Sequence, residues 1–346
     1  MKGRERFKAV LESDETDKVP TFLFDLSLGM DVLKIPTTEV FGPNGFDGIR
    51  SAMSIAALHR HLGHDIAVGS YRTIDNTIFG GKITVPEYGS PYVSKKPFAE
   101  HSELYDVQPE ILCGKMDSVK LSYSALREST PDLGIMKMMM TPFSMAATMR
   151  GLEPFLMDLH TDDMFVNDLI SFETEVFRIV VEELMGLDTD ATILVAPYDD
   201  ADMLGPDIMK KLAFPGMKES IEETRRDGLP VMFHHHGTFL SERGRSALRD
   251  ILSLRPDCFY YGEENDHSIM SQETSGKCTV AGGIDTFTTI YLGPDERVKR
   301  DTEEMLSKMK NKNFIFSCSC SVDRGLPLDR MKIMMDTVRS VSSLKK

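Results

Sequence analysis

The segment Val231–Phe239, VMFHHHGTF, is an apolar run that ends in three consecutive histidines and a glycine. A buried strand that stops at imidazoles and then turns is how a (β/α)8 barrel presents metal ligands at its carboxyl end. Because successive residues of a strand point to opposite faces, His234 and His236 share one face and His235 takes the other. Two neutral imidazoles at this spacing can hold one Zn²⁺. Solvated histidines at a polar strand end are the alternative interpretation.

A second segment, Phe314–Ser321, is built in the same way and ends in Cys318 and Cys320. Two cysteines separated by one residue also share a face of a strand, so both could reach a metal held by His234 and His236. One thiolate is sufficient for a three-residue zinc site, and the sequence leaves open which cysteine binds. The pairing of H-x-H with C-x-C is more specific for a metal than either pattern alone.

Composition and charge narrow the class of protein. The 346 residues are 41% hydrophobic and 27% charged, which is enough to bury a barrel-sized core. A net charge of −14 argues against nucleic acid or an acidic membrane surface as a partner. No apolar run approaches the roughly 18 residues of a membrane helix. Five cysteines and no secretion signal predict reduced thiols and a cytoplasmic enzyme that acts on a small molecule.

Strand-like and helix-like segments alternate along the chain. The expected strands are 20–25, 63–69, 134–140, 191–196, 229–234, 258–261, 278–281 and 314–316, and the expected helices are 49–62, 108–129, 142–159, 162–187, 206–226, 239–254, 295–309 and 327–341. Eight such units predict a single-domain α/β protein, a (β/α)8 TIM barrel over residues 1–346, rather than an open doubly wound sheet. We also expect an N-terminal helical extension at 4–13 and a hairpin excursion around 70–106 that could form a wall of the active site.

Acidic residues follow several of these expected strands. Glu263 and Glu264 could supply a fourth metal ligand, a hydrogen-bond partner for a ligating histidine, or a general acid or base. Asp199 and Asp200 are further catalytic candidates. A solvated loop pair is the alternative for the glutamates, and capping of the helix at 206–226 is the alternative for the aspartates.

Methionine is abundant, with 23 residues and no tryptophan in the chain. The densest cluster is Met136–Thr141, MKMMMT, at the end of an expected strand. Since methionine adapts to varied apolar surfaces, a soft apolar wall of a substrate pocket is predicted, and core packing is the alternative. The residues predicted to form this wall are Met138, Met139, Met140, Phe143 and Phe22.

Taken together, these segments resemble the uroporphyrinogen decarboxylase superfamily and, within it, the cobamide-dependent methyltransferases of methanogens and acetogens. The resemblance covers nearly the whole chain and is carried by RERFKAVLES (4–13), DKVPTF (17–22), AALHRHLGHDIAV (56–68), TPFSMAATMRGLEPFLMDL (141–159), HGTF (236–239), AGGIDT (281–286) and CSVDRGLPLDRM (320–331). It implies a (β/α)8 barrel with a funnel at the carboxyl ends of the strands. It also implies a corrinoid protein, carrying cobalamin, that docks over the funnel.

Two details of the resemblance favour the methyltransferase branch. The decarboxylases carry an arginine-rich segment near the N-terminus, whereas this chain has FLFDLS at 22–27. The methyltransferases have a zinc motif H-x-C followed by a late cysteine. His234 matches the histidine, and Cys320 matches the late cysteine by its distance to Pro327, with Cys318 as the alternative. His236 stands where that branch has its first cysteine.

This departure has a chemical consequence. A neutral imidazole in place of a thiolate leaves the site one unit more positive, which makes Zn²⁺ a stronger Lewis acid and a poorer activator of a bound thiolate. The sequence therefore favours demethylation of a methoxylated aromatic compound, with transfer of the methyl group to the corrinoid protein. The rivals are a methylcobamide:coenzyme M methyltransferase, a metal-free decarboxylase-like lyase, and a non-catalytic corrinoid-protein partner or zinc-storage protein. Whether the barrels pair into a homodimer is left open.

Overall fold

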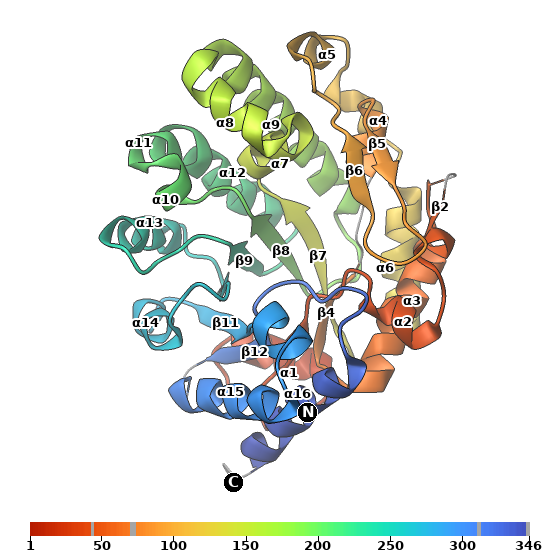
Figure 1. Ribbon diagram of the computed structural model, residues 1–346, viewed down its shortest axis with the longest axis vertical. Coiled ribbons are helices and arrows are strands. Elements are labelled where there is room, and N and C mark those ends of the chain that lie inside the picture. The colour runs from red at the N-terminus through yellow and green to blue at the C-terminus, as the bar shows by residue number, and fades with distance from the viewer. Residues whose placement is uncertain (43–44, 70–73, 310–312, 344–346) are drawn as a thin grey trace.

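The computed structural model describes residues 1–42, 45–69, 74–309 and 313–343, and its centre is a sheet of eight parallel strands (Figure 1). In sheet order these are β1 (Phe22–Leu23), β4 (Ile66–Val68), β7 (Gly134–Met140), β8 (Ala191–Ala196), β9 (Val231–His235), β10 (Cys258–Tyr261), β11 (Thr279–Ile284) and β12 (Phe314–Cys318). Parallel bridges from Thr21 to Phe316 and from Asp25 to Val322 join the last strand to the first. The sheet therefore closes as a barrel, and the predicted (β/α)8 fold is confirmed.

Helices cover the outside of the barrel. The longer ones are α1 (Gly3–Leu11), α3 (Gly48–Leu62), α6 (Asp117–Ser129), α7 (Pro142–Arg150), α8 (Leu152–Thr161), α9 (Asp163–Leu184), α12 (Phe214–Arg225), α13 (Glu242–Ser253), α15 (Asp295–Lys308) and α16 (Leu328–Ser343). Shorter helical segments are α2 (Leu28–Leu33), η1 (Thr37–Glu39), α4 (Ile74–Ile78), α5 (His101–Tyr105), η2 (Pro109–Leu112), α10 (Ala201–Leu204), α11 (Pro206–Ile208), η3 (Met209–Ala213), α14 (His267–Glu273) and η4 (Thr286–Tyr291). None of the helices in the described part of the chain combines the length and apolarity that a membrane crossing requires.

Several helices differ from the sequence-based expectation, and two of these differences have a clear local cause. The helix expected at 142–159 is split into α7 and α8, because Gly151 adopts a φ of +95° that a helix cannot contain. Helix α14, which was not expected, begins where the carboxylate of Asp266 accepts hydrogen bonds from the backbone N–H groups of Ser268 and Ile269.

The barrel's amino end is closed by α1, whose Phe7 and Val10 pack into the barrel interior. Arg6 on the same helix is buried and donates to the carboxylates of Asp65 and Asp17 at 2.5 and 2.6 Å. The predicted N-terminal helical extension therefore plugs the barrel at the end opposite the strand tips.

The predicted hairpin excursion is also present. Strands β5 (Lys82–Thr84) and β6 (Tyr92–Lys95) pair antiparallel, while residues 70–73 of the predicted range lie outside the described residues. The connecting loop reaches the segment after β12, where Ser90 donates to Asp323 at 2.7 Å and the guanidinium of Arg324 lies 4.9 Å from the Tyr88 ring centroid. A second small antiparallel pair joins β2 (Phe41–Gly42) to β3 (Gly45–Phe46).

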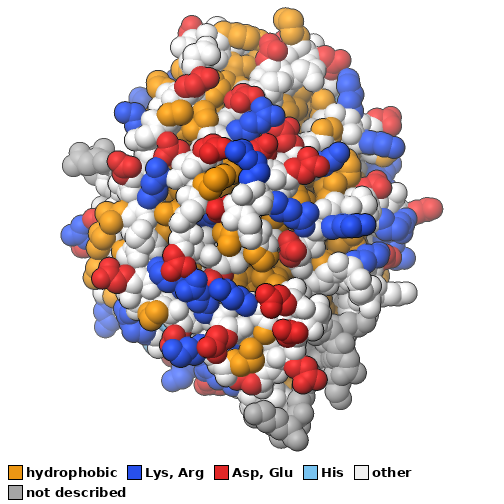
Figure 2. Space-filling model, turned by 180° about the vertical axis from the view of Figure 1, so that it is seen from behind, with side chains coloured by type: hydrophobic (Ala, Val, Ile, Leu, Met, Phe, Trp, Pro, Cys, Tyr) orange, Lys and Arg blue, Asp and Glu red, His pale blue; other side chains and the backbone are white. Residues whose placement is uncertain are grey.

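Alternation along the strands divides the buried side chains into two cores. Phe22, Met136, Ile193, Met232 and Ile315 fill the barrel interior. A larger core lies between the sheet and the helices and takes the residues of opposite parity. The parity of a strand residue therefore decides whether it can contribute to a site at the mouth. On the outer surface, Figure 2 shows basic and acidic side chains interspersed on the face opposite to that of Figure 1.

Candidate metal centre

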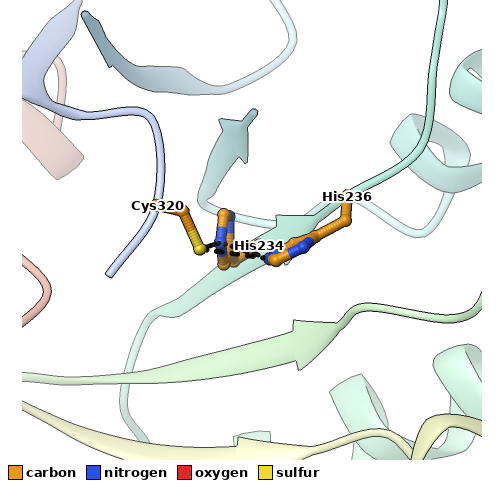
Figure 3. Close-up of side chains that lie close together, drawn as sticks. All are labelled: His234, His236 and Cys320. Carbon is orange, nitrogen blue, oxygen red and sulfur yellow. Dashed lines mark hydrogen bonds between the residues drawn. The ribbon is translucent and has the colours of Figure 1, made fainter. Parts of the chain in front are cut away.

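Three side chains from two separate segments converge beyond the strand tips (Figure 3). His234 belongs to β9, His236 follows that strand, and Cys320 lies two residues beyond β12. The Nε2 atoms of the two histidines are 2.9 Å apart, and the sulfur of Cys320 lies 3.7 Å from Nε2 of His234 and 3.6 Å from Nε2 of His236. The strand tips that the sequence singled out therefore meet.

The separations of these atoms suit zinc. Zn–N bonds of about 2.0–2.1 Å and a Zn–S bond of about 2.3 Å place tetrahedral ligand atoms roughly 3.3 Å (N to N) and roughly 3.6 Å (N to S) apart. Both observed sulfur–nitrogen separations match, and the two nitrogens need to open by only a few tenths of an ångström. Among the described residues, His234, His236 and Cys320 are the one group so arranged. Three protein ligands leave a fourth position for water or substrate, which is the pattern of a catalytic site.

His234 is held in the form that binds a metal. Its Nδ1 lies 3.2 Å from the backbone carbonyl of Tyr260, which can only accept, so Nδ1 carries the proton and Nε2 presents its lone pair. Its ring is stacked on the Tyr260 ring, with centroids 4.0 Å apart. Burial, and then the neighbouring His236, lower the pKa of His234 well below its usual value, so the imidazole is neutral.

The other two side chains are less buried and face the mouth. Burial lowers the pKa of His236, while the charge of Glu263 opposes that shift. Burial raises the pKa of the Cys320 thiol to about 11, so the free thiol is protonated at neutral pH. Binding of a divalent cation would displace that proton, because metals take the thiolate.

His235 points to the other face of β9, as predicted. Its Nδ1 accepts from the backbone N–H of Gly237 at 2.8 Å, and its Nε2 donates to the carbonyl of Asp199 at 2.9 Å. Burial lowers its pKa to about 3. His235 therefore holds the loop after β8 against the loop after β9.

Cys318 does not join the cluster. Strand β12 ends at Cys318, whose sulfur lies 3.9 Å from the sulfur of Met334 in the core between sheet and helices. The chain bends at the next two residues, and this bend brings Cys320 inward. The expectation that the two cysteines share a face is wrong, because the extended geometry on which it depended stops between them.

The predicted acidic residues occupy different environments. Asp199 is fully buried and accepts from the hydroxyls of Thr141, at 2.8 Å, and Ser144. Burial raises its pKa to about 7. Asp200 accepts from the backbone N–H of Asp202 at 3.0 Å and so caps α10, ahead of the helix predicted at 206–226.

Glu263 and Glu264 are exposed beyond β10. Glu263 lies close enough to act on the charges of both His236 and Cys320. Of the four acidic residues, it is the one with this electrostatic reach to two members of the cluster. The catalytic roles of Glu263, Asp199 and Asp200 stay predictions.

The predicted methionine wall is divided by strand parity. Met138 and Met140 are half-buried on the inner face of β7. Met140 pairs with Val195 on β8, and Val195 pairs with His234 on β9, so Met140 and His234 lie at the same height in the barrel. Met139 and Phe143 instead lie in the core between sheet and helices, so their prediction as pocket residues is corrected. Phe22 is fully buried inside the barrel and packs edge-on against Tyr260 at 5.6 Å, beneath the cluster.

Comparison with known protein families identifies the family of this chain. Residues 44–341 match the sequence model of uroporphyrinogen decarboxylase (URO-D). The chain belongs to the uroporphyrinogen decarboxylase family. This membership confirms the superfamily that the motifs at 56–68, 141–159 and 320–331 resemble. A search of curated proteins finds no match to the chain.

Several solved structures resemble this chain over nearly its whole length. A methyltransferase from Methanosarcina mazei superimposes with a TM-score of 0.83 at 17% identity, covering 99% of both chains. A B12-independent methionine synthase from Shewanella sp. W3-18-1 gives a TM-score of 0.56 at 14% identity, over 95% of this chain and 98% of that one. A putative vitamin-B12-independent methionine synthase from Listeria monocytogenes gives 0.54 at 12% identity, over 94% and 99%. At these identities the similarity establishes a shared fold.

One residue of this site was missed from the sequence. Tyr260 lies on β10 beside His234 and is fully buried in the barrel interior. In the strand CFYY its parity with Cys258 predicts an inward position, but a tyrosine in an apolar run carries no local sign of a metal-site role.

Proposed function

We propose that this protein is a zinc-dependent methyltransferase that moves a methyl group between a small methylated donor and the cobalt of a corrinoid protein. A methoxylated aromatic compound is the favoured donor. The observation that carries the proposal is the convergence of His234, His236 and Cys320 at the carboxyl-end mouth of the barrel. Membership of the uroporphyrinogen decarboxylase family and the similarity in fold to a methyltransferase support the choice of methyl transfer.

The ligand set favours an oxygen donor over a thiol. Two neutral imidazoles and one thiolate leave Zn²⁺ with a net charge of +1. When bound, such a zinc ion supplies Lewis-acid activation of an ether oxygen. A second thiolate ligand would remove that positive charge and favour a nucleophilic sulfur instead.

The chain's own residues bind and orient the donor and deliver a proton to the departing oxygen. Met138 and Met140 line the inner face of β7 and pack the apolar part of the donor. Glu263, exposed at the rim within electrostatic range of His236 and Cys320, passes a proton from solvent to the departing oxygen. The methyl–oxygen bond breaks, and its electron pair stays on the oxygen, which takes the proton. The new methyl–cobalt bond forms with the electron pair of reduced cob(I)alamin on the partner protein.

The proposal is tested with zinc-loaded protein, methoxybenzoates and methoxyphenols, and a reduced corrinoid protein, in the absence of coenzyme M. Methylcobamide is expected to accumulate with wild-type protein and with Cys318→Ser, whose sulfur lies outside the cluster. It is expected to be absent with His234→Ala. Failure of wild-type protein to form methylcobamide, while a parallel reaction methylates coenzyme M, overturns the demethylase assignment in favour of thiol methylation.

A further inference from the structure

Tyr260 contacts both halves of the candidate metal centre. On one side, its backbone carbonyl accepts the Nδ1 proton of His234 at 3.2 Å, and its ring lies nearly parallel to the imidazole, at an interplanar angle of 20°. On the other side, its hydroxyl donates to the carbonyl of Cys318 at 2.7 Å and lies 3.4 Å from the carbonyl of Cys320. The hydroxyl of Ser317 donates to the Tyr260 hydroxyl at 3.2 Å.

This reach is unusual because the two ligand-bearing strands are not neighbours. The sheet order is β9, β10, β11, β12, so a side chain on β10 must pass across β11 to touch β12. The inward positions of β11 are Ala281 and Gly283, which leave space for the ring. A Cβ atom on Gly283 would collide with the carbonyl of Ser317, so β11 and β12 approach closely at this level.

The two ends of the site differ in how firmly the backbone holds them. His234 lies within a strand that is paired on both sides. Cys320 lies beyond the end of β12, where backbone hydrogen bonds from Ser319 to Ile284 and from Val322 to Phe24 flank it. The hydroxyl of Tyr260 adds a buried anchor at Cys318 and Cys320, the residues that determine where the sulfur lies.

We propose that Tyr260 is the positioning residue of the metal centre, which holds the Cys320 segment at ligand distance from His234 before the metal binds. The inference rests on the proposed zinc site. A preset site loses less conformational freedom on binding than a site whose sulfur must first be gathered in, so its affinity is higher. Loss of a hydrogen bond that orients a ligating side chain typically costs about 10- to 100-fold in metal affinity, and we expect the same range for a bond that fixes the backbone carrying the ligand.

The test compares two tyrosines of the same strand. Tyr260→Phe keeps the ring and removes the hydroxyl. Tyr261→Phe is the matched control, because Tyr261 is equally buried and its hydroxyl bonds to His267 at 2.9 Å on the outer side of the sheet. Zinc affinity of each folded variant is measured by competition with a chromophoric chelator. Cobalt(II) in place of zinc gives a thiolate-to-metal absorption band as a second readout.

Tyr260→Phe is expected to bind zinc about 10- to 100-fold more weakly than wild-type protein and to show a weaker cobalt–thiolate band at equal occupancy. Tyr261→Phe is expected to match wild-type protein in both. Equal affinities and spectra for the two variants overturn the inference but leave the zinc site standing, whereas a wild-type protein that binds no zinc overturns both. Should Tyr260→Phe not fold, the double variant Tyr260→Phe/Ser317→Ala, which also removes the buried Ser317 hydroxyl left without its acceptor, is compared with Ser317→Ala in the same two measurements and decides in the same way.

Discussion

Asp199 offers a test of whether a buried carboxylate beside the site is structural or catalytic. Its side chain is fully buried, and its partners are the hydroxyls of Thr141 and Ser144 rather than a cation. Burial raises its pKa to about 7. Replacing it with asparagine keeps an acceptor for one hydroxyl and an amide donor for the other, and removes the ability to ionise.

The sign and size of the effect follow from the pKa. An unfolded aspartate has a pKa of about 3.9, so the folded state holds this proton more tightly. The contribution of Asp199 to stability is therefore fully present below about pH 4 and is lost as pH rises towards 7, at up to about 1.4 kcal/mol per pH unit. The total loss in the free energy of unfolding between about pH 4 and 7 is at most about 4 kcal/mol. Asp199→Asn does not show this loss, because asparagine does not ionise.

Urea unfolding of both proteins at several pH values between about 4 and 8 measures this difference. The stability of Asp199→Asn relative to wild-type protein is expected to increase steadily up to about pH 7 and then level off. Asp202→Asn, at an exposed neighbouring position, serves as the control. A difference that does not change with pH would refute the reasoning. Retention of methyl transfer by Asp199→Asn would mark the residue as structural, and its loss in a stable variant would mark it as catalytic.

Three further outcomes are expected. Cys320→Ser should weaken zinc binding by about 100-fold or more, whereas Cys318→Ser should leave zinc binding unchanged and cost about 1–3 kcal/mol of stability, because its hydroxyl is buried in the core. Chelator competition checks this, and equal effects on zinc would contradict it. Free zinc at about 100 times its dissociation constant should stabilise the protein by about 2.7 kcal/mol, reversed by a chelator, and an unchanged melting temperature would contradict it. Arg6→Ala should destabilise by about 3–5 kcal/mol in urea, because it leaves the buried Asp65 and the partly buried Asp17 without their main cation, and a loss below about 1 kcal/mol would count against that.

The sequence alone predicted the features that depend on residues close together in the chain. An apolar run that ends in polar residues locates β7, β8, β9 and β12, and the period of two within a strand correctly separated His235 from His234 and His236. It also identified Cys320 as one of the two cysteines that could complete the group.

The rest depended on contacts that no single segment contains. The end of β12 at Cys318 follows from its pairing with Ile284 and from the bridge between Val322 and Asp25, which lies beyond β1, so the bend that separates the two sulfurs could not be seen in C-x-C alone. The outward placement of Met139 required knowing that an unbroken apolar run alternates between two cores. The role inferred for Tyr260 on β10 rests on its contacts with β9 and with the end of β12, which only the folded structure brings together.

X-ray absorption at the zinc edge of the purified, zinc-loaded protein tests most directly whether distant strand tips share one metal ion. The first coordination shell should contain one sulfur at about 2.3 Å and two imidazole nitrogens at about 2.0–2.1 Å, with a light atom in the fourth position. The sulfur should disappear in Cys320→Ser and remain in Cys318→Ser. A shell without sulfur in the wild-type protein, or one whose sulfur survives the loss of Cys320, would contradict the account.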